Sequence, residues 1–111
     1  MKIGISVENG SVSGHFGHCP TFAVYELNDG AEVGAPTIHQ APPHERGVLP
    51  RWLRDLGVDV IVTGGMGRHA LALCGELGMQ VILGVAEESP ADVVERFRAG
   101  VLTSGANTCD H

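Results

Sequence analysis

Apolar residues in the first part of the chain alternate with polar or small residues. This period of two is typical of half-buried β-strands. An Asp-Gly pair separates the last two alternating segments and predicts a hairpin between them. The three predicted strands cover residues 2–7, 21–27 and 32–39.

From Val48 onward the apolar residues recur every three or four positions, which predicts helices. Three such segments begin at Val48, after residues 64–67 and at Ser89, where Ser89 is a candidate N-cap followed by Pro90. Each segment ends at a glycine: Gly57, Gly78 and Gly100. Short apolar runs at 58–63 and 79–83 are predicted as buried parallel strands.

The element order βββαβαβα predicts an α/β fold of three layers, a five-stranded mixed sheet with helices on both faces. Residues 1–111 are expected to form one domain, with a flexible loop at 8–18 and a flexible tail at 103–111. If the first and fourth strands are parallel neighbours, loops 8–18, 64–67 and 84–89 open at one sheet edge, where such sheets place ligands.

Charge and hydropathy exclude several classes of function. Seven Lys and Arg against 13 Asp and Glu give a net charge of −6, and no basic run is present, so nucleic acid is not expected as a partner. No apolar run approaches the roughly 18 residues of a membrane span, and the start of the chain is too polar for a signal peptide. We therefore expect a cytoplasmic protein that contacts no membrane, with Cys19, Cys74 and Cys109 as free thiols.

The loop after the first strand gathers potential metal ligands. His15, His18 and Cys19 lie within five residues, and imidazole and thiolate suit copper, zinc, iron and metal–sulfur clusters. Such histidines can equally be solvent-exposed loop residues. Phe16 and Gly17, between the two histidines, are further candidate cofactor-binding residues, and Phe16 is expected to anchor the loop on the sheet.

A glycine-rich segment joins the fourth strand to the second helix. Its amides can face an anion at the positive end of the helix, although glycines can also serve only tight packing. The candidate binding residues there are Gly64, Gly65, Met66, Gly67 and Arg68. The spacing matches no nucleotide-binding motif, so no nucleotide cofactor is expected.

Two further soft ligands end the chain. Cys109 and His111 could swing over the site as a thiolate and imidazole pair, or belong to a frayed tail. Cys74, by contrast, lies on the apolar stripe of the second helix and is expected in the core.

These motifs together resemble the dinitrogenase iron-molybdenum cofactor-binding domain family, the nitrogenase-accessory and orange-protein group. The resemblance rests on GHFGH at 14–18, IVTGGMG at 61–67 and VILG at 81–84, and it covers nearly the whole chain. It implies a ribonuclease H-like fold without nuclease activity and binding of an iron-molybdenum-sulfur or molybdenum-copper-sulfide cluster. The family's key histidine falls on His15, and Cys19 stands where many relatives have alanine.

Three functions follow as expectations. The first is a carrier or store of a molybdenum-containing cluster, which exchanges it with a donor or recipient protein and catalyses no reaction. The second is a mononuclear copper or zinc protein, and the third is an accessory interaction module with a vestigial site. A catalytic reading has little support, because no orienting acid or oxyanion element accompanies the histidines and cysteine.

Overall fold

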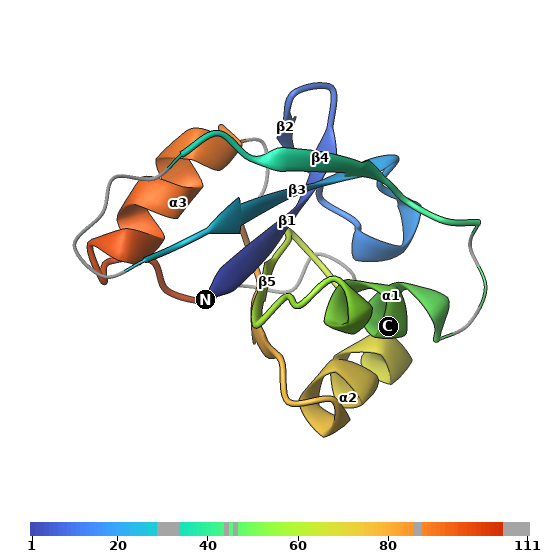
Figure 1. The fold of residues 1–111 in the computed structure, drawn as a ribbon. Helices are drawn as coiled ribbons and strands as arrows, with labels where there is room; N and C mark the ends of the chain where they lie inside the picture. The colour runs from blue at the N-terminus through green and yellow to red at the C-terminus, as the bar shows by residue number, and fades with distance from the viewer. Residues whose placement is uncertain (29–33, 44, 46, 86–87, 106–111) are drawn as a thin grey trace.

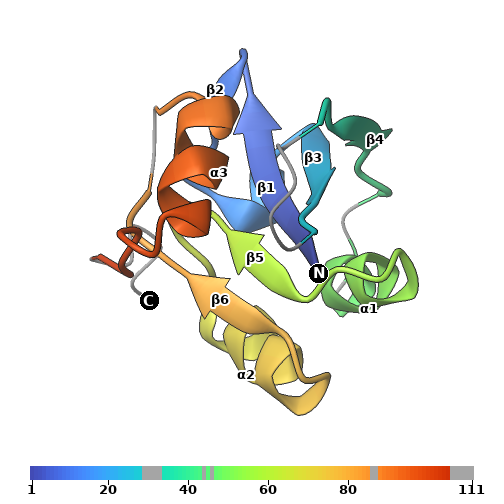
Figure 2. The ribbon, with the colours of Figure 1, turned by 60° about the vertical axis from the view of Figure 1, so that its left-hand side comes forward.

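A mixed β-sheet forms the middle layer, with helices on both of its faces (Figures 1 and 2). The structure is a computed structural model that describes residues 1–28, 34–43, 45, 47–85 and 88–105. In chain order its elements are β1 (Lys2–Glu8), β2 (Ser11–Val12), the 3-10 helix η1 (Phe16–His18), β3 (Thr21–Glu26), β4 (Thr37–Gln40), α1 (Val48–Asp55), β5 (Val60–Val62), α2 (Arg68–Glu76), β6 (Gln80–Ile82) and α3 (Pro90–Arg98).

The strand order is β4-β3-β1-β5-β6, with β2 paired to β1 alone. β1 is antiparallel to β3 and parallel to β5, which is itself parallel to β6. The predicted α/β class, the five main strands and the helices on both faces are confirmed. Within the described residues the sheet nevertheless has six strands. The sequence pattern missed β2, because a strand of two residues is too short to be periodic.

Two apolar clusters lie on the two faces of the sheet. One joins α3 to β1, with Val93 and Val94 packed among Ile3 and Ile5. The other joins α1 and α2 to the opposite face, and there β1 presents the small residues Gly4 and Ser6. A Cβ on Gly4 would lie 3.2 Å from Val58 Cγ1, so the glycine lets this layer approach the central strand closely.

Several predicted boundaries shift. The strand predicted over 32–39 corresponds to β4, which covers Thr37–Gln40, and residues 34–36 are not part of a strand. The start of the prediction at 32–33 and the Asp-Gly turn lie outside the described residues. Ser89 occupies the N-cap of α3 but makes no side-chain capping hydrogen bond there. Segment 8–18, predicted as an irregular loop, contains β2 and η1, because its backbone pairs with β1 and Phe16 is buried. Its mobility stays a prediction.

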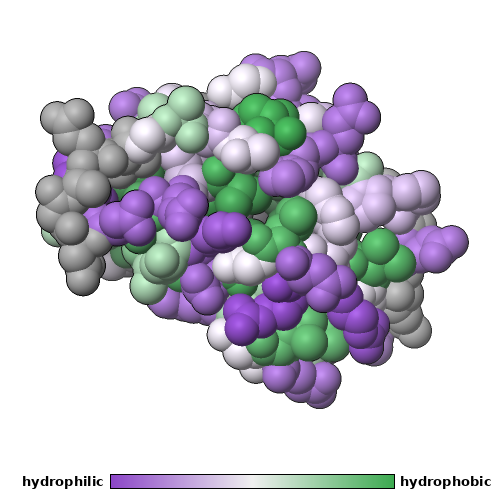
Figure 3. All heavy atoms as spheres, in the orientation of Figure 1, coloured by the Kyte–Doolittle hydropathy of each residue, from purple (hydrophilic) through white to green (hydrophobic). Residues whose placement is uncertain are grey.

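The described surface carries no large apolar area on the face shown in Figure 3, where green patches are separated by polar residues. The exposed large apolar side chains are Met1, Ile38, Leu71 and Val101. Among the helices of the described residues, none has an apolar stretch long enough to cross a lipid bilayer.

Substitution of two glycines by alanine tests where α1 and α2 end. Gly57 follows α1 at φ +87°, a conformation that a side chain strains, so Gly57→Ala should lower the free energy of unfolding by about 1 kcal/mol. Gly75 lies inside α2 with open space around its Cα, so Gly75→Ala should raise it by about 0.5 kcal/mol. Urea denaturation midpoints that move in the same direction for both variants would contradict this assignment.

Candidate functional site

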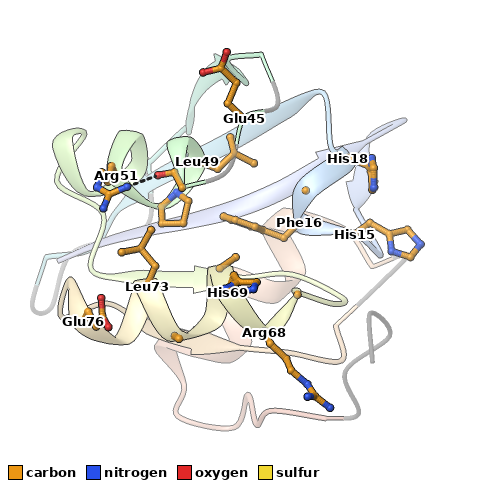
Figure 4. Close-up of a pocket in the computed structure, with 16 residues that line it drawn as sticks. His15, Phe16, His18, Glu45, Leu49, Arg51, Arg68, His69, Leu73 and Glu76 are labelled. Atoms are coloured by element: carbon orange, nitrogen blue, oxygen red, sulfur yellow. Dashed lines mark hydrogen bonds between the residues drawn. The ribbon is translucent and has the colours of Figure 1, made fainter. Parts of the chain in front are cut away.

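A groove with a cavity volume of about 1250 Å³ lies where η1, α1 and α2 meet (Figure 4). One end carries His15 and His18, and the other carries Arg51, Leu73 and Glu76. The full lining consists of His15, Phe16, Gly17, His18, Glu45, Gly47, Leu49, Pro50, Arg51, Gly67, Arg68, His69, Ala70, Ala72, Leu73 and Glu76.

The two loop histidines lie together at the groove, as their spacing predicts. Their side chains are exposed, and their ring centroids are 6.2 Å apart with the rings edge-on at 80°. η1 produces this arrangement, because it turns the chain between them while Phe16 is buried beneath and packs edge-on against Phe22 at 5.5 Å. Phe16 is therefore an anchor that also forms part of the groove floor. Two imidazoles at one rim can ligate a soft or borderline metal or donate hydrogen bonds to an anion.

Backbone hydrogen bonds fasten this loop to the segment after β5. The Gly64 N–H donates to the Ser13 carbonyl at 2.9 Å, and the Phe16 N–H donates to the Gly65 carbonyl at 2.8 Å. The next loop is tied in as well, since the Gly84 N–H donates to the Gly64 carbonyl at 2.9 Å. The loops after β1, β5 and β6 thus meet at one sheet edge, which confirms the predicted convergence.

Of the segment 64–67, which the sequence predicts to face an anion, only Gly67 lines the groove. Gly64, Gly65 and Met66 are buried and do not line the groove, and the Gly64 amide is already bonded to Ser13. Met66 belongs to the core beside Cys74, whose thiol lies 3.9 Å from the Met66 sulfur. The Met66 side chain therefore belongs to the core, and Gly64 and Gly65 lie beneath the groove lining. A contact of this segment with a cofactor stays a prediction.

Gly67 and the first turn of α2 do face the groove. Gly67 is the N-cap in extended conformation without a side-chain cap, and Arg68, His69 and Ala70 follow it along the lining. A helix start of this kind presents N–H groups at the positive end of the helix dipole. An anion in the groove can therefore be met by backbone amides as well as by the Arg68 side chain.

The arginines divide into two groups. Three form ion pairs: Arg54 with Asp59, Arg96 with Glu88 and Arg98 with Glu95. Arg51 and Arg68 form no ion pair within the described residues, and both line the groove. Glu45 and Glu76 also line it, but Glu76 lies at the end away from the histidines. Arg51 lies at that same end, whereas Arg68 begins α2, and the net charge of the chain is −6.

Cys19, predicted as a metal ligand, lies in the core and not in the groove. It is 0% exposed, and its thiol donates to the Phe16 carbonyl at 3.3 Å. Burial, together with a smaller effect of the negative charge of Glu8, raises its pKa to about 12 against the opposing effect of a backbone hydrogen bond. Burial likewise raises the pKa of Cys74 to about 11. A neutral, enclosed thiol is a poor ligand, so we leave Cys19 out of the candidate site.

Cys109 and His111 lie outside the described residues. The chain is described up to Gly105, whose N–H donates to the Leu83 carbonyl at 2.6 Å, while Ser104 Oγ accepts from the Leu83 N–H at 2.9 Å. Within the described part of the chain, no three His, Cys, Asp or Glu side chains are close enough to hold a metal ion together. Among the predicted metal ligands, those that the structure places at the groove are therefore the imidazoles of His15 and His18.

The groove wall formed by α1 and α2 is absent from the sequence prediction. Leu49, Pro50 and Leu73 form its apolar part, and Arg51 is held by a hydrogen bond to the Gly47 carbonyl at 3.4 Å. The helical period identifies each helix but not which parts of the two helices border a groove. That depends on how the helices pack on the sheet and on each other.

Fold and groove together define a small α/β domain that presents two imidazoles and a helix N-terminus at one sheet edge. The chain belongs to the dinitrogenase iron-molybdenum cofactor family, whose sequence pattern matches residues 1–100. This confirms the resemblance drawn from the loop motifs and associates the chain with that cofactor.

Two solved structures share the fold over all or nearly all of their length, and one further protein is similar in sequence. The crystal structure of PH0822 superposes with a TM-score of 0.87 at 29% identity, covering 100% of both chains. The apo form of the orange protein from Desulfovibrio gigas gives 0.78 at 23% identity, over 96% of this chain and 93% of that one. The Methanocaldococcus jannaschii protein MJ0580 is 28% identical over 85 residues, 73% of this chain and 72% of its own.

The buried thiols yield a chemical prediction. In a Cys109→Ser variant, Cys19 and Cys74 should resist iodoacetamide at about pH 8 while the protein is folded and react in denaturant. The raised pKa of Cys19 also predicts how stability depends on pH. In the unfolded protein the thiol ionises above its ordinary pKa of 9.0, whereas in the folded protein it stays neutral up to about pH 12. The free energy of unfolding should therefore fall as the pH rises from 9 toward 12. Rapid alkylation of the folded variant would contradict the buried placement.

Proposed function

We propose that this protein binds and carries a molybdenum-containing metal–sulfide cluster at the histidine end of the groove. The observation that carries the proposal is the convergence there of two exposed imidazoles, the amides that begin α2 and the Arg68 guanidinium. Metal–sulfide clusters of this kind are anionic and expose both metal and sulfide. Imidazoles suit the metal, and amides and guanidinium suit the sulfide charge.

The apolar floor supports the same cargo. Phe16 and Leu49 are buried and line the groove between the charged groups. Sulfide ligands hydrogen-bond more weakly than oxygen, so an apolar wall costs them little hydration and keeps water from the metal. The chain belongs to the iron-molybdenum cofactor family, and this membership supports a molybdenum-containing ligand over other anions. The iron-molybdenum-sulfur and molybdenum-copper-sulfide types both fit this description.

In this proposal the protein is a carrier or store and catalyses no reaction. The cluster arrives from a donor protein and leaves to a recipient, in the cytoplasm. Nucleic acid and membrane have no part in it. The ribonuclease H-like designation of the fold belongs to the same proposal, and it rests on the family resemblance.

Reconstitution tests the function. The apo protein is mixed anaerobically with tetrathiomolybdate and copper, or with isolated iron-molybdenum cofactor, and then desalted. We expect a coloured, stoichiometric complex with sulfide-to-metal charge-transfer bands that neither component shows alone. A spectrum equal to the sum of free cluster and protein would refute the proposal. A colourless complex with one copper or zinc would instead establish the mononuclear alternative.

His15 is predicted to contribute more to binding than His18. His15→Ala should weaken cluster binding by roughly tenfold or more, because an imidazole at the groove rim is lost. The exposed side chain adds little to the core, so the melting temperature should stay within about 4 °C of the original.

Two further variants control the ranking. His39 packs against Trp52, away from the groove, and His39→Ala should leave cluster affinity unchanged. His18→Ala should produce a smaller loss than His15→Ala. Equal losses at both loop positions, measured by spectroscopic titration, would contradict the ranking.

The terminal Cys109 and His111 are proposed as additional ligands. Gly105 is held at the sheet edge that carries the site, and the six residues after it can span about 20 Å. The paired substitution Cys109→Ser and His111→Ala should therefore lower cluster affinity without changing the melting temperature. Unchanged affinity would restrict the ligands to the loop histidines.

A further inference from the structure

Three buried hydroxyls lie beneath the loop that carries His15. Ser6 is on β1, Thr63 follows β5 and Ser13 follows β2, and all three side chains are at most 3% exposed. The Ser6 hydroxyl lies 2.8 Å from Thr63 Oγ1, and each of these two oxygens lies 3.4 Å from the Ser13 carbonyl oxygen. Hydroxyls of both parallel strands thus converge on one carbonyl of the loop.

Ser13 in turn forms hydrogen bonds with the backbone of His15. Its Oγ accepts the His15 backbone N–H at 3.1 Å and lies 3.2 Å from the His15 carbonyl oxygen, to which it donates. The Ser13 carbonyl also accepts the Gly64 N–H. A single serine therefore ties the backbone of His15 to β1 and to the segment after β5.

A hydroxyl group in a core is costly unless all of it is hydrogen-bonded, and apolar residues would fill the same space. Here every described buried side-chain nitrogen or oxygen has a partner. Hydrogen bonds in such a poorly solvated place are directional and strong, so they fix geometry better than apolar contact does. The segment after β5 leads directly into α2, and the same network therefore relates His15 to the first turn of that helix.

We propose that Ser13 is a positioning residue for His15, and that the Ser6–Thr63 pair holds Ser13 in place. This inference rests on the proposed cluster-binding function and deepens it. The network holds the imidazole-bearing loop at a fixed place relative to the N-terminus of α2 before the cluster arrives. Binding then requires less ordering of the loop, and affinity is higher for that reason.

The primary test removes one hydroxyl. Ser13→Ala deletes both contacts to the His15 backbone but keeps the Ser13 carbonyl and its bond from Gly64. We expect the Kd for the tetrathiomolybdate–copper cluster to rise about tenfold. Ser13→Thr, which keeps Oγ, should restore the affinity to within about twofold of the original.

Ser11 offers a matched control in the same hairpin. Its side chain makes no hydrogen bond within the described residues, so Ser11→Ala should leave the Kd unchanged. A second variant separates positioning from stability: Ser6→Ala with Thr63→Val removes both buried hydroxyls together and leaves neither one unpaired. It should keep a melting temperature close to the original and still weaken cluster binding.

Apo-protein NMR gives a readout that does not depend on the cluster. In this proposal an ordered loop replaces the flexible one expected from the sequence: backbone order parameters of residues 14–18 should be about 0.85 in the original apo protein and fall below about 0.6 in Ser13→Ala. If these values stay unchanged in Ser13→Ala, or if Ser13→Thr fails to restore the order, the positioning role is overturned. Ordered loops in a protein that binds no cluster would refute the proposed function while leaving Ser13 as the residue that orders the loop.

Discussion

The site depends on a row of backbone hydrogen bonds across one edge of the sheet. The Gly64 N–H donates to the Ser13 carbonyl, and the Gly84 N–H donates to the Gly64 carbonyl. These bonds hold side by side the loops that follow the parallel strands β1, β5 and β6. These contacts need backbone atoms to approach closely, and glycine at 64 and 84 permits that approach. Because the row is fixed, the histidine loop and the first turn of α2 face each other across one groove.

In the proposed function, that geometry offers positively charged groups to an anion on an otherwise acidic protein. Its paired arginines are neutralised elsewhere, whereas Arg51 and Arg68 line the groove without a carboxylate partner among the described residues. Arg68 begins α2, and Arg51 lies at the end of the groove away from the histidines. A helix start adds partial positive charge that cannot be titrated away. In the proposed function, recognition of the anionic cluster thus depends on a small part of the surface.

The sequence patterns predict elements better than they predict exposure. Periodicity locates α1, α2, α3 and five strands, and the strand order places the three loops at one edge. The spacing of His15 and His18 identifies the part of the site that local structure alone creates. Whether Cys19 or Met66 faces the groove depends instead on long-range packing, and both lie in the core. β2 and the wall between α1 and α2 were missed for the same reason, since neither has a local signature.

The most direct test of the account is where the cluster contacts the protein. Amide chemical shifts of the apo protein are followed while tetrathiomolybdate and copper are added anaerobically. The account predicts that the changes concentrate at residues 14–18 and 67–70, on the two sides of the groove, with saturation at one cluster per chain. Changes centred on β3 and β4, or scattered changes without saturation, would contradict it.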